Sequence, residues 1–365
     1  MPTDYPGLNP QSTALYNQEQ TRLLGALLPL TAGGLVETIE HIGSTSVPGL
    51  AGSARVDIGL AVWPFPLQSD RQALLEALGY ESIAAMDSSE QRYCRQSDGV
   101  QLFIAEAGQE RWLDYLILRD YLRANEPTRR SWITMMSNPQ RFETVLPDAR
   151  RWWVQSQGFV PVNAIASELK ALACQWCISS GWALDLFLGE VSRLHYDVDV
   201  NLARADQLIL QRYMLDHGWQ WLTPFERRLE PWPPRMRLAD PRHQAHAHRD
   251  GAFIDFLLTD IEHGVWHYRR APMIIRSVER MSLTTSDGIP YLAPELVLLF
   301  KSKNTSGRER SKDQMDFERV YTHLEPERRA WLRWALIATE ATHPWLEQLI
   351  RSDRSAFVSP TLEKP

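Results

Sequence analysis

Two aspartates separated by a single residue, Asp197 and Asp199, place the strongest constraint on how this chain folds. They lie in His195-Tyr-Asp-Val-Asp-Val200, whose alternation predicts a strand with both carboxylates on one face and the valines on the other. Carboxylates this close repel each other unless a cation joins them, and oxygen-rich sites suit Mg²⁺, which also takes substrate phosphates as ligands. The pattern therefore predicts a metal-binding strand. Taken alone, such a pair is weak evidence, because it is more often an edge or loop feature with solvated carboxylates.

A third aspartate and an upstream turn extend this pattern. Asp255 lies in an otherwise apolar predicted strand, where an unpaired charge would be costly, so we expect it to join the other two as a metal ligand. Residues 176–181 predict a buried strand that ends in a tight turn at Ser180-Gly181, and residues 182–188 predict a helix. The first amides of such a helix can receive a phosphate. Together these features predict a phosphoryl-transfer site in which the three aspartates are catalytic.

Composition narrows the class of protein. A formal net charge of −6 and a pI near 6.0 argue against a broad basic surface for duplex nucleic acid, so we expect a small-molecule substrate and no stable nucleic-acid complex. The longest uncharged stretch, residues 23–36, is shorter than the roughly 20 residues that a membrane helix needs. The N-terminus lacks the pattern of a secretion signal, and three cysteines cannot form a disulfide framework. We expect a cytoplasmic protein whose Cys174 and Cys177 have no metal or redox role.

The length of 365 residues predicts two domains, at about 150 residues each. Three prolines between residues 137 and 162 mark a break before a helix expected to begin near Ile165, which places the boundary near residue 162. The expected domains are residues 1–162 and 163–365. Both halves show the order helix, strand, small turn and acidic strand, which indicates duplication of a fold rather than of a sequence.

The second half resembles a known family of enzymes. Gly181-Trp-Ala-Leu-Asp-Leu-Phe-Leu-Gly189, followed by Ser192-Arg-x-His-x-Asp-x-Asp199, is similar to the aminoglycoside and lincosamide nucleotidyltransferases. Gly288-Ile-Pro-Tyr-Leu-Ala-Pro-Glu295 and Lys312-Asp-x-x-Asp-Phe317 follow in the order of that family. The similarity covers nearly all of residues 165–348. It implies an α+β, polymerase-beta-like nucleotidyltransferase fold, in which a mixed sheet is flanked by helices and followed by a C-terminal helical extension.

This resemblance also implies roles for single residues. Asp197 and Asp199 would bind Mg²⁺ and the nucleotide, and Asp255 would be a further metal ligand or a base toward the acceptor hydroxyl. Ser180 and Gly181 would cradle the triphosphate of an NTP, with ATP the most natural co-substrate. Ser180 departs from the usual Gly-Gly turn of the family, although its hydroxyl can still donate a hydrogen bond.

Basic residues near the nucleotide complete the expected site. Arg193 and Lys301 are expected to contact it. The basic run that begins at Lys301 either adds charge near the phosphates or forms a solvated helix end, and its later members are Lys303, Arg308, Arg310 and Lys312. Three histidines, His243, His246 and His248, are expected in a loop or at the surface rather than at a metal.

The first half resembles a different family. The string Ile39-Glu-His-Ile-Gly-Ser-Thr-Ser-Val-Pro-Gly-Leu50, followed by Val56-Asp-Ile58, is similar to GrpB proteins, a compact branch of the nucleotidyltransferase fold. The similarity implies a phosphate-facing, nucleotide-binding turn at Gly43 and Ser44, with Asp57 on the next strand. Gly59 stands where we expect the second acid of an Asp-x-Asp pair. This departure favours a nucleotide-binding or structural module over an independent catalyst.

The leading hypothesis is therefore a Mg²⁺-dependent nucleotidyltransferase that modifies a hydroxyl of a small molecule. An aminoglycoside-like antibiotic is the most natural acceptor, by resemblance alone. Two alternatives stay open. One is a toxin-like relative that modifies protein or tRNA, and the other is a non-catalytic nucleotide sensor.

Overall fold

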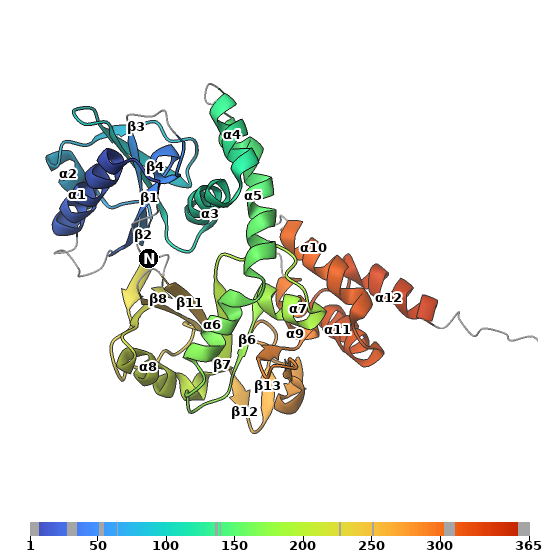
Figure 1. Cartoon of the computed structure of the whole chain (residues 1–365). Coiled ribbons are helices and arrows are strands. Elements are labelled where there is room, and N and C mark those ends of the chain that lie inside the picture. Colours follow the sequence, from blue (N-terminus) through green and yellow to red (C-terminus); the bar gives the residue numbers. More distant parts are fainter. Residues whose placement is uncertain are drawn as a thin grey trace, which may run out of the picture. The chain divides into compact units, whose positions relative to one another are not determined.

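The chain forms two compact units, which are described separately (Figure 1). The computed structural model describes residues 7–27, 35–50, 55–63, 65–135, 138, 140–225, 228–249, 252–302 and 311–356. The first unit comprises residues 1–157 with 218–232 and 246–253, and the second comprises 158–217, 233–245 and 254–365. The division expected near residue 162 stays a prediction.

The first unit is built on a five-stranded mixed sheet with the order β1-β2-β5-β4-β3. Its strands are β1 (Leu35–Ile42), β2 (Val56–Trp63), β3 (Glu81–Ile83), β4 (Glu90–Arg95) and β5 (Val100–Glu106). Strands β1 and β2 are antiparallel, β2 and β5 are parallel, and the β5-β4-β3 ladder is antiparallel. The parallel pair at the centre places residues of β2 directly beside residues of β5.

Helices cover both faces of this sheet. They are α1 (Pro10–Leu27), α2 (Ser69–Ala77), α3 (Glu110–Ala124), α4 (Glu126–Thr134) and α5 (Arg141–Gln157). Even-numbered residues of β2, such as Ile58 and Leu60, pack with Leu23 of α1 and Leu75 of α2 in one core. The odd-numbered Ala61 packs with Trp112 and Tyr115 of α3 in a second core. The alternation along β2 therefore directs Asp57 toward the α3 side of the sheet.

An eight-stranded mixed sheet with the order β15-β16-β6-β7-β11-β10-β8-β9 carries the acidic strand. Its strands are β6 (Trp176–Ile178), β7 (Val198–Ala203), β8 (Gln220–Phe225), β9 (Arg228–Pro231), β10 (Gln244–Arg249), β11 (Ala252–Thr259), β15 (Ser282–Thr284) and β16 (Pro290–Leu292). A small antiparallel sheet contains β12 (Ile261–Glu262), β13 (Val265–His267) and β14 (Ile275–Ser277). The accompanying helices are α6 (Val160–Glu168), α7 (Ser180–Leu188), α8 (Gln207–Asp216), α9 (Pro294–Lys301), α10 (Ser311–Val320), α11 (Pro326–Thr339) and α12 (Trp345–Ala356).

Both sheets contain the same three-strand arrangement. In the first, β1 is antiparallel to β2, which is parallel to β5; in the second, β6 is antiparallel to β7, which is parallel to β11. In each case a tight turn follows the first strand. This agreement supports the predicted duplication, and the mixed sheets flanked by helices confirm the predicted α+β class.

The segment expected to break the chain before a helix at Ile165 is mostly helical, which corrects that expectation. Helix α5 continues through Pro147 because its buried residues, Val145, Leu146 and Ala149, belong to a helix that packs on α3, and this packing outweighs a proline penalty of roughly 3 kcal/mol. Helix α6 already begins at Val160, with a proline in its first turn, where no amide donor is needed.

The structure also bears on the membrane and cysteine expectations. No helix among the described residues has the length and apolarity needed to cross a membrane. Cys94, Cys174 and Cys177 are all free of disulfide bonds. Burial raises the pKa of Cys177 to about 12, so this thiol is poorly suited to act as a nucleophile or metal ligand.

We predict that Ile104→Ala lowers the free energy of unfolding of the first unit by roughly 2 to 5 kcal/mol, because the Ile104 side chain is fully buried in β5. Chemical denaturation measures this change. The matched control is Ile133→Ala on α4, where the side chain is 41% exposed, and it should change stability by no more than about 0.5 kcal/mol. Equal losses in the two variants would contradict the assigned core.

Candidate functional site

The three predicted aspartates meet at the parallel pair β7 and β11. The register of this pair places Asp199 directly beside Asp255. Asp197 lies just before β7, and its backbone carbonyl accepts a hydrogen bond of 2.9 Å from the indole nitrogen of Trp182 on α7. Asp199 of β7, Asp197 just before it and Asp255 of β11 are thus brought together, although 56 positions separate Asp199 from Asp255.

Burial and mutual repulsion dominate the electrostatics of this cluster. Burial, followed by the charge of Asp197, raises the pKa of Asp199 to about 7. Burial and then the charge of Asp199 raise the pKa of Asp255 well above its ordinary value. Burial also raises the pKa of Asp197, an effect opposed first by the charge of Lys312. A cation among these carboxylates would relieve both costs.

The Ser180-Gly181 turn lies against the cluster. Ser180 has a φ of 53°, in the left-handed region that costs a residue with a Cβ roughly 1 kcal/mol, and its hydroxyl bonds to Asp199. A Cβ at Gly181 would overlap the side chains of Arg193 and His195, so only glycine fits there. The helix predicted from residue 182 already begins at Ser180 as α7. The serine therefore keeps the conformation of a glycine turn and adds a donor.

The predicted nucleotide contacts Arg193 and Lys301 converge on one carboxylate that sequence reasoning did not assign. Asp316 of α10 forms ion pairs with Arg193 at 3.1 Å and with Lys301 at 2.8 Å. Lys301 also contacts Asp313 at 2.8 Å. Asp316 thus holds both cations at the site. Of the later basic run, Lys312 lies at the site, whereas Lys303, Arg308 and Arg310 lie outside the described residues.

A buried Asp-His pair lies against the turn at Gly181, and the sequence analysis did not assign it a role. Asp185 of α7 is fully buried and contacts the His195 imidazole at 2.7 Å, while Arg319 approaches its second oxygen at 3.5 Å. Burial lowers the pKa of His195, against the opposing influence of Asp185. The signal was present in the sequence, because Asp185 is a single acid within an apolar helical run.

Two cavities, each of about 350 Å³, share the wall formed by Ser180, Asp199 and Lys301. The first also contains Asp197, and its further polar lining includes Gly181, Arg193, Lys312 and Gln314. The second contains Asp255, and its further polar lining includes His243, Gln244 and Arg269, whereas Arg270 lines both cavities. Carboxylates therefore lie between two chambers of similar size, which suits transfer of a group from one bound molecule to another.

The expectation that His246 and His248 lie in a loop or at the surface is wrong. His246 and His248 are buried in β10, with 8% and 5% of their surfaces exposed, because the alternation of this strand directs both to a covered face. Burial lowers the pKa of His246 to about 4. His243, just before β10, lines the second cavity.

The donor set fits a hard divalent cation, since carboxylate oxygens are the ligands that Mg²⁺ prefers. Among the described residues, however, no three carboxylate, imidazole or thiol groups form a ready-made metal cluster. The side chains of Asp197, Asp199 and Asp255 are therefore adjacent without the close convergence of a bound site. Gly43 and Ser44, the other predicted nucleotide contacts, line a separate cavity of the first unit.

Comparison with known proteins divides the chain at the same two regions. Residues 7–138 match the family model of the GrpB protein, and residues 161–319 match that of aminoglycoside-2''-adenylyltransferase. The second half is thus similar to a nucleotidyltransferase domain. A UPF0157 protein of Streptomyces coelicolor is 35% identical over 114 residues, which are 31% of this chain and 58% of that protein. The chain spans less than two thirds of the length of this relative.

Two solved structures are also similar. GrpB from Enterococcus faecalis has 21% identity and a TM-score of 0.32, over 39% of this chain and 94% of that one. The lincomycin-bound lincosamide antibiotic adenylyltransferase LnuA has 16% identity and a TM-score of 0.33, over 44% of this chain and 94% of that one.

We predict that Asp199 makes the metal-free protein less stable as pH rises. Its pKa of about 7 in the folded protein exceeds the ordinary value of 3.8, so between these values unfolding releases a proton and stability falls with pH. Relative to the wild type, Asp199→Asn should gain stability across this window, by at most about 1.4 kcal/mol per pH unit. Denaturation in EDTA at several pH values measures it. The control Asp216→Asn, at an exposed ion pair of α8, should show no such trend, and a pH-independent effect of Asp199→Asn would contradict the assignment.

Proposed function

We propose that the domain of residues 163–365 is a Mg²⁺-dependent nucleotidyltransferase that moves a nucleoside monophosphate from an NTP to a hydroxyl of a small molecule. The observation that carries this proposal is the register of β7 and β11, which sets Asp199 beside Asp255 at the wall between two cavities. The match of residues 161–319 to an adenylyltransferase family supports the same reaction and favours ATP as the donor.

The cavity that contains Asp197 is assigned to the nucleotide. Its turn at Ser180 and Gly181 opens α7, whose first amides can donate to phosphate oxygens. Lys301 and Lys312 line the same cavity and offer positive charge to the triphosphate. Arg193 is held by Asp316 in a fixed orientation at the edge of this space. These groups orient the α-phosphate toward the carboxylates.

Asp197, Asp199 and Asp255 would hold the metal ion. Bound Mg²⁺ supplies positive charge against the α-phosphate oxygens and the departing pyrophosphate. The carboxylates of the protein would need only small side-chain movements to converge, because strand register already fixes their backbones side by side. The elevated pKa values of Asp199 and Asp255 fit a site in which a bound cation offsets the negative charge of the carboxylates.

The cavity that contains Asp255 is assigned to the acceptor. The acceptor hydroxyl would attack the α-phosphorus in line, so that a new oxygen–phosphorus bond forms while the bond to pyrophosphate breaks. Burial raises the pKa of Asp255, which fits a carboxylate able to take the hydroxyl proton in the same step. The Gln244 amide donates a hydrogen bond to Asp255 and orients it toward that role.

The family match supports our choice of acceptor class. The matched family is named for adenylylation of aminoglycosides, and one similar structure is a lincosamide adenylyltransferase, so we propose a hydroxyl-bearing antibiotic, aminoglycoside-like first. The net charge of −6 favours such a small molecule over an RNA acceptor. A need for cellular NTPs fits the cytoplasmic location predicted from the sequence.

We predict that full-length protein with Mg²⁺ and α-labelled ATP transfers label to at least one member of a panel of aminoglycosides and lincosamides. Asp199→Asn should lower the transfer rate by more than about 100-fold, because it removes a carboxylate at the reacting centre. Label transfer and pyrophosphate release measure the reaction, and Asp216→Asn serves as the matched control, since this carboxylate pairs with Arg212 at the surface of α8.

Three results would count against the proposal. Equal transfer by Asp199→Asn and the wild type would show that the site is wrongly placed. Nucleotide binding without transfer to any drug would favour a sensor. Transfer to tRNA or protein, but to no drug, would favour a toxin-like enzyme.

A further inference from the structure

The shared strand arrangement allows the two units to be compared position by position. In the second unit, Ser179 at the end of β6 lies opposite Asp199, and its amide donates 2.8 Å to the Asp199 carbonyl. In the first unit, Ile42 at the end of β1 lies opposite Asp57. The next residue has a positive φ in both, 53° at Ser180 and 70° at Gly43. Asp57 therefore corresponds to Asp199.

This correspondence changes which residue of the first unit stands in place of an acid. The position two residues before Asp57, equivalent to Asp197, is Arg55. Asp57 is paired in parallel with Gln101 of β5, just as Asp199 is paired with Asp255. The expectation that Gly59 occupies the position of the missing acid is wrong. Asp57 corresponds to the second aspartate of the pair, so the missing acid precedes it on the strand instead of following it. The three acidic positions of the second unit are thus arginine, aspartate and glutamine in the first.

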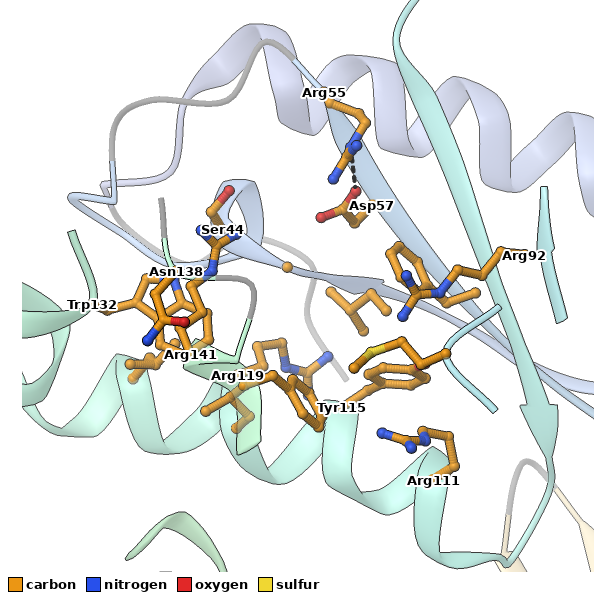
Figure 2. A pocket seen from close by; sticks show the side chains of 17 residues that line it. Ser44, Arg55, Asp57, Arg92, Arg111, Tyr115, Arg119, Trp132, Asn138 and Arg141 are labelled. Carbon is orange, nitrogen blue, oxygen red and sulfur yellow. Dashed lines mark hydrogen bonds and ion pairs between the residues drawn. The ribbon is translucent and has the colours of Figure 1, made fainter. Parts of the chain in front are cut away.

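A divalent metal does not fit this set. The Arg55 guanidinium donates 3.0 Å to the Asp57 carboxylate and places a cation of the chain itself where a metal would bind (Figure 2). Burial raises the pKa of Asp57, and the charges of Arg55, Arg92 and Arg141 act in the opposite direction. Three guanidinium groups therefore act on the Asp57 carboxyl, and the described residues that line its cavity include no second carboxylate.

A cavity of about 460 Å³ opens at this point, within the size range of small-molecule sites. Asp57 is its only lining carboxylate among the described residues. Its walls carry five arginines, contributed by several elements around one space, and these are Arg55, Arg92, Arg111, Arg119 and Arg141 (Figure 2). The turn residues Gly43 and Ser44 line the same space, and a Cβ at Gly43 would overlap Asp57.

Most of these arginines are held by carboxylates that do not line the cavity. Glu90 contacts Nε of Arg92 at 2.7 Å, and Asp87 contacts a terminal nitrogen of Arg111 at 2.5 Å. All three nitrogens of Arg119 donate hydrogen bonds, to Glu40, Asp120 and the His41 carbonyl. This arginine therefore adds positive charge to the cavity but no hydrogen-bond donor for a ligand. The ion pair at Nε leaves the terminal nitrogens of Arg92 able to donate to a ligand. Such orientation reduces the entropy that a bound anion would cost.

Apart from Asn138, the rest of the lining is aromatic and apolar. Phe103 of β5, Tyr115 of α3 and Phe142 of α5 lie together, with ring centroids 5.5 Å apart for Phe103 and Tyr115 and 5.9 Å apart for Tyr115 and Phe142. Trp132 of α4 carries the Arg141 guanidinium 5.2 Å from the centre of its ring. Aromatic rings beside oriented arginines suit a ligand that combines a flat ring with an anionic group.

We propose that this cavity binds a nucleoside phosphate without a divalent metal, its phosphate at the Gly43-Ser44 turn and its arginines, its base among the aromatic rings. Arg55 takes the place of the metal beside Asp57. The cavity therefore acts as a second nucleotide site whose requirements differ from those of the transfer site, and this proposal stands independently of the function proposed for residues 163–365.

Isothermal titration of AMP into full-length protein in EDTA tests the proposal. AMP should bind, and adenosine and inorganic phosphate should each bind at least tenfold more weakly, because each lacks one half of the ligand. Arg92→Gln and Arg141→Gln should weaken AMP at least tenfold. The matched control is Arg130→Gln, whose side chain is 77% exposed and pairs with Glu126, and it should leave the affinity unchanged. Circular dichroism establishes that each variant is folded.

A further variant tests the role of Arg55 itself. Arg55→Asp should abolish AMP binding in EDTA at concentrations that saturate the wild type. The proposal is overturned if AMP binds the wild type only with Mg²⁺, or if both Gln variants bind AMP in EDTA as the wild type does, since the metal-free site would then lie elsewhere. Equal affinity for AMP and phosphate, or for AMP and adenosine, would overturn the class of ligand. Unchanged binding by Arg55→Asp would refute the substitution of arginine for the metal.

Discussion

The parallel pairing of β7 with β11 is the constraint on which the site depends. It places Asp199 beside Asp255 in register, and Asp197 follows because only one residue separates it from Asp199. Three acidic side chains in a buried setting oppose folding, and the raised pKa values of all three express that cost. The Ser180 hydroxyl, Lys301 and Lys312 offset part of it. Strongly perturbed pKa values of this kind are typical of functional sites, so the cost itself points to a function at this position.

The first unit shows what the same backbone does with other side chains. Its β1, β2 and β5 pair as β6, β7 and β11 do, yet Arg55 and Gln101 stand where the second unit has acids. The first unit thus has an arginine and a glutamine where the second unit has two aspartates, and guanidinium groups surround its remaining aspartate. Fold and chemistry are therefore separable here, and the side chains at three register positions distinguish the two sites that we propose, one for metal-dependent transfer and one for metal-free binding.

Carboxylates outside the two sites determine how their cations are presented. Asp316 holds Arg193 and Lys301 at the transfer site, and Glu90 and Asp87 hold Arg92 and Arg111 at the cavity of the first unit. A guanidinium that is already oriented loses less freedom when an anion binds. The sequence separation of these pairs ranges widely, because Glu90 and Arg92 are neighbours on β4 whereas Arg193 and Asp316 are 123 residues apart.

The sequence by itself determined the α+β class, the acidic strand, the turn at Ser180-Gly181 and the resemblance of each half to a family, because local alternation and short motifs encode these features. It misjudged the helices around Pro147 and Pro161, since tertiary packing outweighs local propensity there, and it placed His246 and His248 outside the core. Only the tertiary structure decided that Asp255 faces Asp199, that Asp316 joins Arg193 to Lys301, and that Arg55 rather than Gly59 replaces an acid. Each of these depends on which strand pairs with which and in what register, and pairing between distant segments leaves no periodic mark in a single sequence.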